Sequence, residues 1–145
     1  MSELSTGPAT AVLMTRLSRR VYRVAREDRI GMSMKVFSTL NVVRHHHDGI
    51  AQQALGEILG TDANMLVLLL NQAEDAGFLR RVRDPKDRRR HIVELTDAGR
   101  KALERAEAGV EAVEDEILSA LEPEERVQLR ALLIKALTAD GDDAA

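Results

Sequence analysis

Apolar residues recur at helical spacing along most of this chain of 145 residues. The apolar runs cover residues 10–28, 33–45, 52–59 and 61–76. In the first run, four apolar side chains lie four, four and three residues apart and share one helix face: Leu13, Leu17, Val21 and Val24. Glycine ends helices readily: Gly31 lies between the first and second runs, Gly60 lies between the third and fourth, and Gly77 ends the fourth. The pattern predicts a mainly α-helical protein.

Few aromatic residues are available to the core. They make up 2% of the chain, as Tyr22, Phe37 and Phe78, whereas 44% of all residues are hydrophobic. The core must therefore consist of aliphatic side chains, which favours packed helices over a β-sandwich. The length suits one compact domain, residues 1–145. Cysteine is absent from the sequence, which excludes a disulfide framework, a thiolate zinc site and a thiol nucleophile.

Polar residues that cap helices mark several boundaries. Ser33 is a good N-cap for the helix that ends near His45, and residues 46–49 are typical of a turn. The next two helices are joined through Gly60, and we expect Thr61 to cap the second, with Asp62 at its positive end. Two short helices joined by a tight glycine turn predict a helix-turn-helix unit.

A β-hairpin is expected directly after this unit. Residues 78–83 and 91–95 have strand character, and the sequence from Asp84 to Asp87 can turn the chain. From Arg80 to His91 there are seven Lys and Arg and two Asp, a net charge of +5. Residues 104–145 hold twelve acidic and four basic side chains, a net charge of −8. A chain with this polarity can bind phosphate at one end despite its overall charge of −3.

Two helices follow the hairpin. Thr96 caps a long helix, and Pro123 begins the last one. Five apolar residues of the long helix recur at heptad-like spacing: Leu103, Ala106, Val110, Val113 and Ile117. We expect this seam and the apolar last helix to remain exposed in one chain and to form a dimer interface.

The hairpin segment carries the most specific motif. Asp87-Arg88-Arg89 is followed by Val93, Leu95-Thr96 and Gly99. In this arrangement the sequence resembles the MarR family of multiple antibiotic resistance regulators, over residues 13–137. The resemblance implies a mainly α fold with a small β-hairpin wing, in which residues 33–96 form a winged helix-turn-helix and residues 10–30 and 97–138 form a helical dimerisation region.

The resemblance also implies a function. Members of the family bind pseudo-palindromic operators as homodimers, usually repress nearby genes, and often release DNA when a small aromatic ligand binds. By this resemblance Arg88 or Arg89 enters the minor groove of double-stranded DNA, and Asp87 pairs with a neighbouring arginine to stiffen the wing tip. Arginine suits this role because its delocalised charge tolerates partial burial in a narrow groove.

The recognition helix, residues 61–76, is expected to divide into two faces. The core face holds Leu66, Leu69, Leu70 and Ala73. The candidate DNA-binding residues are on the opposite face and in the wing: Asp62, Asn64, Val67, Leu68, Asn71, Arg83, Lys86, Arg88, Arg89 and Arg90. Asn64 suits a paired contact with adenine and Val67 a thymine methyl. The helix face lacks the Ser, Thr and Arg of many family members, so a winged-helix module that binds protein is the alternative function.

A ligand pocket is predicted near the first two helices. Tyr22 and Phe37 offer rings for stacking, and His45 and His47 lie at the following turn. The run from His45 to His47 also allows a metal hypothesis with Asp48, although a polar helix end explains it as well. We assign no metal and no cofactor.

Several classes of protein do not fit the sequence. We find no catalytic constellation and no phosphate-cradling glycine loop, so we expect no enzyme. No stretch approaches the roughly 20 apolar residues of a membrane span, and residues 1–10 lack a signal-peptide profile. We therefore expect a soluble cytoplasmic protein, with no membrane partner.

Overall fold

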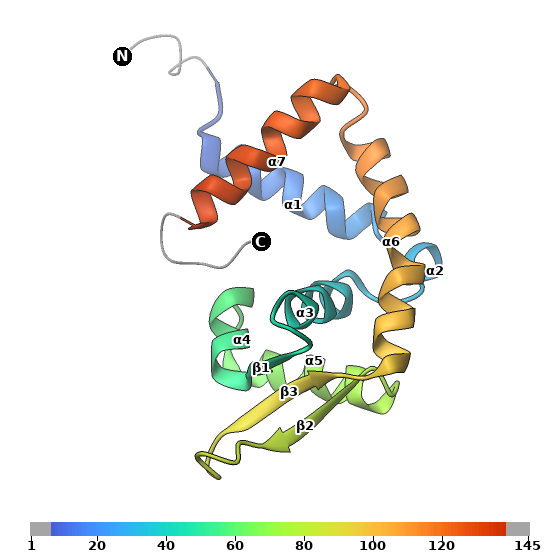
Figure 1. The fold of residues 1–145 in the computed structure, drawn as a ribbon. Helices are drawn as coiled ribbons and strands as arrows, with labels where there is room; N and C mark the ends of the chain where they lie inside the picture. Colours follow the sequence, from blue (N-terminus) through green and yellow to red (C-terminus); the bar gives the residue numbers. More distant parts are fainter. Residues whose placement is uncertain (1–6, 139–145) are drawn as a thin grey trace.

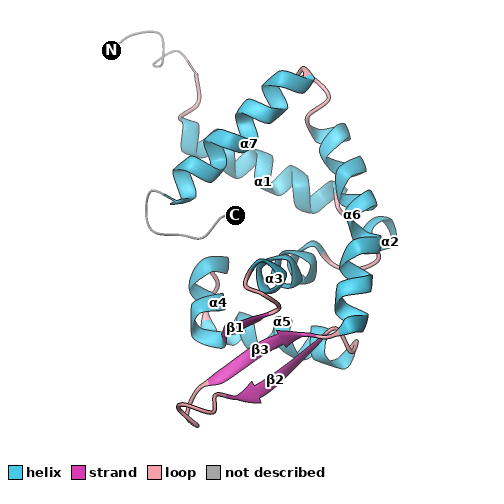
Figure 2. Ribbon diagram, in the orientation of Figure 1, coloured by secondary structure: helices cyan, strands magenta, loops and turns pink. Residues whose placement is uncertain are grey.

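The computed structural model describes residues 7–138. Its helices are α1 (Thr10–Val24), α2 (Glu27–Ile30), α3 (Met34–His45), α4 (Gln52–Leu59), α5 (Ala63–Asp75), α6 (Asp97–Ile117) and α7 (Pro123–Thr138). Its strands are β1 (Gly49–Ala51), β2 (Leu79–Arg83) and β3 (His91–Leu95). The predicted class, mainly α with a small β-hairpin wing, is confirmed (Figure 2).

Helix α6 connects the two ends of the molecule (Figure 1). At one end lie α1 and α7, and at the other lie α3, α4, α5 and the sheet. The sheet is antiparallel with strand order β1-β3-β2, so β3 is central and β2 forms an edge. None of the helices within residues 7–138 is both long and apolar enough to cross a bilayer.

Local sequence explains most of the helix boundaries. Ser33 caps α3, and its Oγ accepts a hydrogen bond of 3.1 Å from the backbone N–H of Val36. Gly60 ends α4 in the left-handed region with φ of 62°, as expected. The first predicted helix is shorter than expected: α1 ends at Val24, and the separate helix α2 follows the buried residue Ala25.

The prediction that Thr61 caps the recognition helix is wrong. The cap is Asp62, whose Oδ1 accepts a hydrogen bond of 2.8 Å from the backbone N–H of Met65. Thr61 instead completes the end of α4, because its N–H donates to the carbonyl oxygen of Gly56 at 3.2 Å. Asp62 is then the residue with the extended backbone that an N-cap requires.

Strand β1 was not expected from the sequence. It pairs with β3, with Ile50 opposite Val93, and both residues are buried. The turn before it places His47 and Asp48 at φ of 55° and 66°, a left-handed backbone. A three-residue strand after a polar turn is too short to show alternation, so residues 49–51 carry no strand signal.

The heptad-like seam of α6 does not form an exposed face, contrary to prediction. Four of its residues are buried within the chain's own core: Leu103, Ala106, Val113 and Ile117. Helix α6 contacts α1, α2 and α3, which cover the seam. Most of the large apolar residues left exposed in a single chain lie on α1 and α7 instead, with Val67 and Leu68 on α5; those of α1 and α7 are Val12, Leu13, Met14, Tyr22, Val127, Leu132, Leu133 and Leu137.

Candidate nucleic-acid interface

The wing is a hairpin in which β2 and β3 pair along five residues of each strand, from Leu79 opposite Leu95 to Arg83 opposite His91. Its base is attached to α6 through Thr96. The Thr96 hydroxyl donates to the carbonyl oxygen of Gly77 at 2.6 Å and accepts from the N–H of Gly99 at 3.0 Å. The cap of α6 therefore also fixes where the wing begins.

The loop at the tip, residues 84–90, is closed by its own hydrogen bonds. The N–H of Asp84 donates to the carbonyl oxygen of Arg90 at 2.9 Å. Asp87 Oδ1 accepts from both the backbone N–H and the Nε of Arg89, at 3.1 and 3.2 Å. The Arg83 guanidinium donates to the carbonyl oxygen of Arg88 at 2.7 Å. These bonds tie the tip to the strands without using most of its cations.

The tip cations point toward solvent. Lys86, Arg88, Arg89 and Arg90 are all exposed, and 91% of the Arg89 side chain is accessible despite its pairing with Asp87. Within residues 7–138, the side chains of Lys86, Arg88 and Arg90 have no hydrogen bond or ion-pair partner. Such groups are available to an external anion at little cost in internal contacts.

Helix α5 lies beside this hairpin, and its two faces divide as the periodicity predicted. Leu66, Leu69, Leu70 and Ala73 are buried. Asp62, Asn64, Val67, Leu68 and Asn71 are exposed. Val67 and Leu68 are 40% and 56% accessible, which is high for branched aliphatic residues, and residues 62–75 include no Lys or Arg. The exposed face of α5 thus offers amides and methyl groups, whereas the wing offers charge.

Arg81 of β2 joins the wing to α5, and sequence reasoning missed it. Its guanidinium donates to Glu74 through Nε and Nη2 at 3.2 and 3.1 Å, and to Asn71 Oδ1 through Nη2 at 2.6 Å. This hydrogen-bonded cation lowers the pKa of the Glu74 carboxyl below its ordinary value. Within a run of arginines, only the strand period distinguishes Arg81 from its exposed neighbour Arg80.

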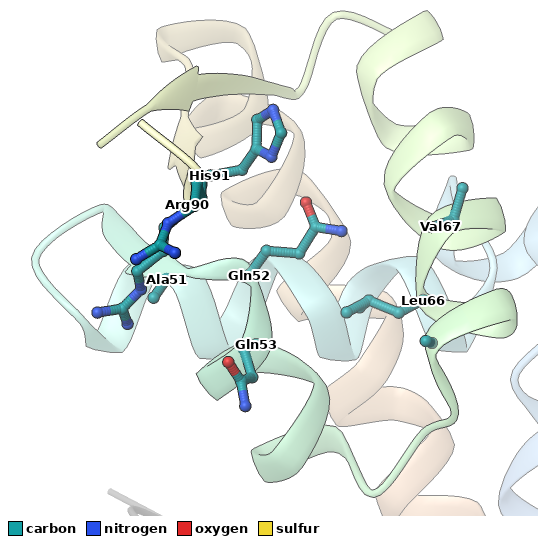
Figure 3. Close-up of a pocket in the computed structure, with 9 residues that line it drawn as sticks. Ala51, Gln52, Gln53, Leu66, Val67, Arg90 and His91 are labelled. Carbon is teal, nitrogen blue, oxygen red and sulfur yellow. The ribbon is translucent and has the colours of Figure 1, made fainter. Parts of the chain in front are cut away.

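A shallow pocket of about 320 Å³ opens between the helix-turn-helix and the wing. Figure 3 shows its lining side chains: Gln52 and Gln53 come from α4, Leu66 and Val67 from α5, and Arg90 and His91 from the wing. Its walls combine apolar surface with the guanidinium groups of Arg89 and Arg90, which precede β3, and the ring of His91, which begins it. The pocket makes α4, α5 and the wing parts of one continuous surface.

The four predicted ligand-binding residues lie in different environments. Phe37 is buried in the core, and Tyr22 is 49% exposed on α1. His45 Nδ1 donates to the carbonyl oxygen of Asn41 at 2.7 Å, as at a polar helix end. His47 lines a polar pocket with Asp48 and Arg100 that contains none of the other three residues. No group of three or more potential metal ligands occurs within the described residues.

Another cavity, of about 510 Å³, lies between α1, α6 and α7. Its lining is mainly aliphatic, including Leu17, Val21 and Val127, and Glu114 is on its edge. Desolvation raises the pKa of Glu114 above its ordinary value, and the charges of Asp115 and Glu111 act in the same direction. This cavity is remote from the wing and continuous with the exposed apolar residues of α1 and α7.

Comparison with known proteins places this arrangement among transcriptional regulators. The family model described as "MarR family" matches residues 34–91, from α3 to the start of β3. The "Putative transcriptional regulatory protein for hcr operon" of Thauera aromatica is 30% identical over 115 residues, which cover 79% of this chain and 69% of that protein. "Transcriptional regulator HosA" of Escherichia coli O111:H- is 36% identical over 91 residues, which cover 63% of this chain and 67% of that protein.

Solved structures share the fold over nearly the whole chain. A mutant of MarR from E. coli complexed with operator DNA superimposes with a TM-score of 0.73 at 24% identity, covering 88% of this chain and 92% of that one. The PcaV transcriptional regulator of Streptomyces coelicolor was solved in complex with its natural ligand. It superimposes with a TM-score of 0.73 at 24% identity, and the match covers 99% of each chain. These similarities establish the winged-helix fold.

Proposed function

This chain belongs to the MarR family of transcriptional regulators, and we propose that it acts by binding duplex DNA through α5 and the wing. The observation that carries this proposal is the group of unpartnered cations Lys86, Arg88 and Arg90 on a hydrogen-bonded tip beside α5. DNA phosphates are anions that such cations neutralise with release of counterions.

The wing and α5 contact different parts of the duplex. Arg88 or Arg89 of the wing enters the flanking minor groove, where the negative potential is enhanced, and Asp87 holds the tip in shape. Arg83, Lys86 and Arg90 add phosphate contacts. The exposed N-cap and exposed residues of α5 face the major groove, namely Asp62, Asn64, Val67, Leu68 and Asn71. Affinity therefore comes mainly from the wing, and base readout from α5 is sparse.

We assign the active form to a homodimer. The exposed apolar residues of α1 and α7 make a surface that a monomer rarely leaves in water. Residues 10–30 and 97–138 form the dimerisation region, and residues 33–96 the DNA-binding region. A two-fold dimer presents two equivalent wings and recognition helices, so it reads a pseudo-palindromic operator.

The protein acts as a repressor that releases DNA when a small aromatic ligand binds. In support, PcaV, which shares the fold, was solved with its natural ligand. In this chain Tyr22, Phe37, His45 and His47 are the proposed ligand-binding residues. A separate cavity of about 510 Å³ between α1, α6 and α7 is lined by Leu17 and Val21 of α1 and by none of these four residues, and it offers a second place for an apolar ligand. A ligand that binds the released state more tightly shifts the equilibrium away from DNA.

Selection of DNA fragments by the purified protein tests the proposal. We expect enrichment of one pseudo-palindromic sequence, and loss of that enrichment with one member of a panel of phenolic compounds. Failure to enrich any sequence at low salt would refute operator binding. Enrichment that no compound changes would remove the ligand response and leave DNA binding intact.

The exposed pair Val67 and Leu68 favours a second candidate, a winged-helix module that binds another protein. Such a module would bind duplex DNA weakly and through charge alone. The two functions separate in one experiment: operator binding requires an affinity that depends steeply on salt and differs between selected and scrambled duplexes.

A further inference from the structure

We propose that Arg81 determines part of the base preference of α5, because it holds Asn71 so that only the amide NH₂ group faces the DNA. The inference rests on the proposed DNA-binding function and adds to it a positioning residue outside the predicted interface. It also gives the two exposed asparagines of α5 different roles.

The inference rests on a short hydrogen bond from Arg81 to Asn71, in which Arg81 is also held by Glu74. Arg81 Nη2 lies 2.6 Å from Asn71 Oδ1, while Nε and Nη2 donate to the two carboxylate oxygens of Glu74. The Arg81 side chain is 24% accessible, so it lies against α5, and Asn71 is exposed. A planar guanidinium held by two carboxylate bonds has little freedom to turn away.

The chemistry of the two groups fixes the orientation of the amide. A guanidinium has only donors, so the atom of Asn71 that faces Arg81 must be its oxygen. The edge of the amide that carries the oxygen then faces Arg81, and the hydrogen anti to the oxygen is directed away from Arg81. Rotating the amide by 180° would place NH₂ against the guanidinium and lose the hydrogen bond of 2.6 Å.

This orientation restricts which base edges Asn71 can read. An amide recognises adenine through two bonds at once, accepting from N6 and donating to N7. The oxygen of Asn71 is turned toward Arg81, so the paired contact with adenine, which needs the amide oxygen and nitrogen together on one base edge, is blocked. The remaining amide N–H can donate to the acceptors O6 and N7 of guanine or O4 of thymine. Asn64 differs, because within residues 7–138 its side chain makes no hydrogen bond and remains free to adopt either orientation.

The test is selection of random duplexes by four proteins, with the enriched base read at each position. Arg81→Met removes the donor that holds Asn71. Asn71→Asp keeps an acceptor for Arg81 but removes the amide donor. Arg80→Met is the matched control, since Arg80 is on the same strand, pairs with Glu94 at 2.8 Å, and loses the same charge.

We expect the wild type and Arg80→Met to favour guanine or thymine at one position of each half-site. Arg81→Met should gain adenine there, by roughly tenfold relative to wild type, the size of one good paired contact. Asn71→Asp should shift the preference toward cytosine, whose N4 donates to a carboxylate. Thermal melting of each variant shows whether the fold is retained. If Arg81→Met unfolds, the shift toward cytosine in Asn71→Asp still tests whether the Asn71 amide donates to a base.

Two results overturn the inference in different ways. If Arg81→Met and Asn71→Asp are folded and select the same bases as the wild type, the inference is wrong and DNA binding stands. If the wild type selects no sequence and its affinity does not depend on salt, the proposed function fails and the inference with it.

Discussion

The carbonyl oxygen of Phe78 lies 2.1 Å from the position that a Cβ atom on residue 99 would occupy. Gly99 therefore allows the first turn of α6 to lie directly against the residue that precedes β2. The same carbonyl accepts a hydrogen bond of 3.0 Å from the N–H of Thr96. This contact joins the wing to the helix that leads to α7, and it explains the glycine of the hairpin motif.

The substitution Gly99→Ala should destabilise the protein by about 3 kcal/mol or more, because a methyl group there meets backbone that cannot rotate away. In an ordinary helix the same change stabilises by about 0.5–1 kcal/mol. Gly56→Ala is the control, since its Cβ would meet the Leu66 side chain at 3.1 Å and the Thr61 carbonyl oxygen at an ordinary contact distance of 3.9 Å. Denaturant unfolding measures both variants, and a Gly99→Ala protein as stable as wild type would contradict the packing described.

The sequence predicted elements whose signal is local. The boundaries of α4 and β3 agree with expectation, because Gly60 stops one and the alternation of His91 to Leu95 marks the other. The seam from Leu103 to Ile117 was predicted to contact a second chain, but helices of the same chain cover it. Its period shows that one face of α6 is buried, but a period does not say whether the covering helices belong to the same chain or to another.

The substitution Leu132→Asp should weaken the dimer by roughly 100-fold or more, because the two-fold interface loses one buried leucine from each chain and gains two charges. Leu132 is 63% exposed in the single chain, so the fold of each chain should survive. Sedimentation at several concentrations measures the dissociation constant. Ser119→Asp, in the exposed turn before α7, should leave assembly unchanged. A wild-type monomer at micromolar concentration would contradict the dimer.

The substitution Asn64→Ala should cost about 1–3 kcal/mol of binding free energy on the selected operator and little on scrambled DNA, because a base contact is lost. Gln72→Ala, an exposed amide near the other end of α5, is the matched control. Titrations on both duplexes give the two free energies. An equal loss on operator and scrambled DNA would show that Asn64 contacts phosphate and does not read a base.

The ion pair of Arg81 and Glu74 should make wing stability depend on pH. Because the pKa of Glu74 is lowered in the folded state, its stabilisation is present above the ordinary glutamate pKa of about 4.3 and is lost as pH falls through the lower folded value. Glu74 is 39% exposed, so the effect should be below about 1 kcal/mol. The melting temperature of Glu74→Gln should be lower than wild type at neutral pH, with the difference shrinking in acid. Glu57→Gln, which removes the same charge from an exposed position on α4, is the control variant.

The sequence predicted those parts of the candidate site that have a distinctive charge or a regular residue spacing. The basic hairpin and the buried face of α5 can be read from residue types at fixed intervals. The contact between Arg81 and Asn71 joins a strand to a helix ten residues earlier and depends on how those elements pack. The strand period separates Arg81 from Arg80, but it does not show that Arg81 contacts Asn71 and Glu74 of α5.

Binding of the double variant Arg88→Ala/Arg89→Ala to operator and scrambled duplexes at two salt concentrations tests the central claim most directly. If a dimer neutralises roughly eight phosphates, log K should fall with log salt at a slope of about −7 for the wild type. Losing four cations per dimer should flatten it to about −3.6, weaken binding to every sequence, and relax preference for A·T pairs in the flanking minor groove. Lys101→Ala/Arg105→Ala, on exposed α6, should retain the wild-type slope. If the double wing variant binds both duplexes as the wild type does, the wing is not the DNA-binding element.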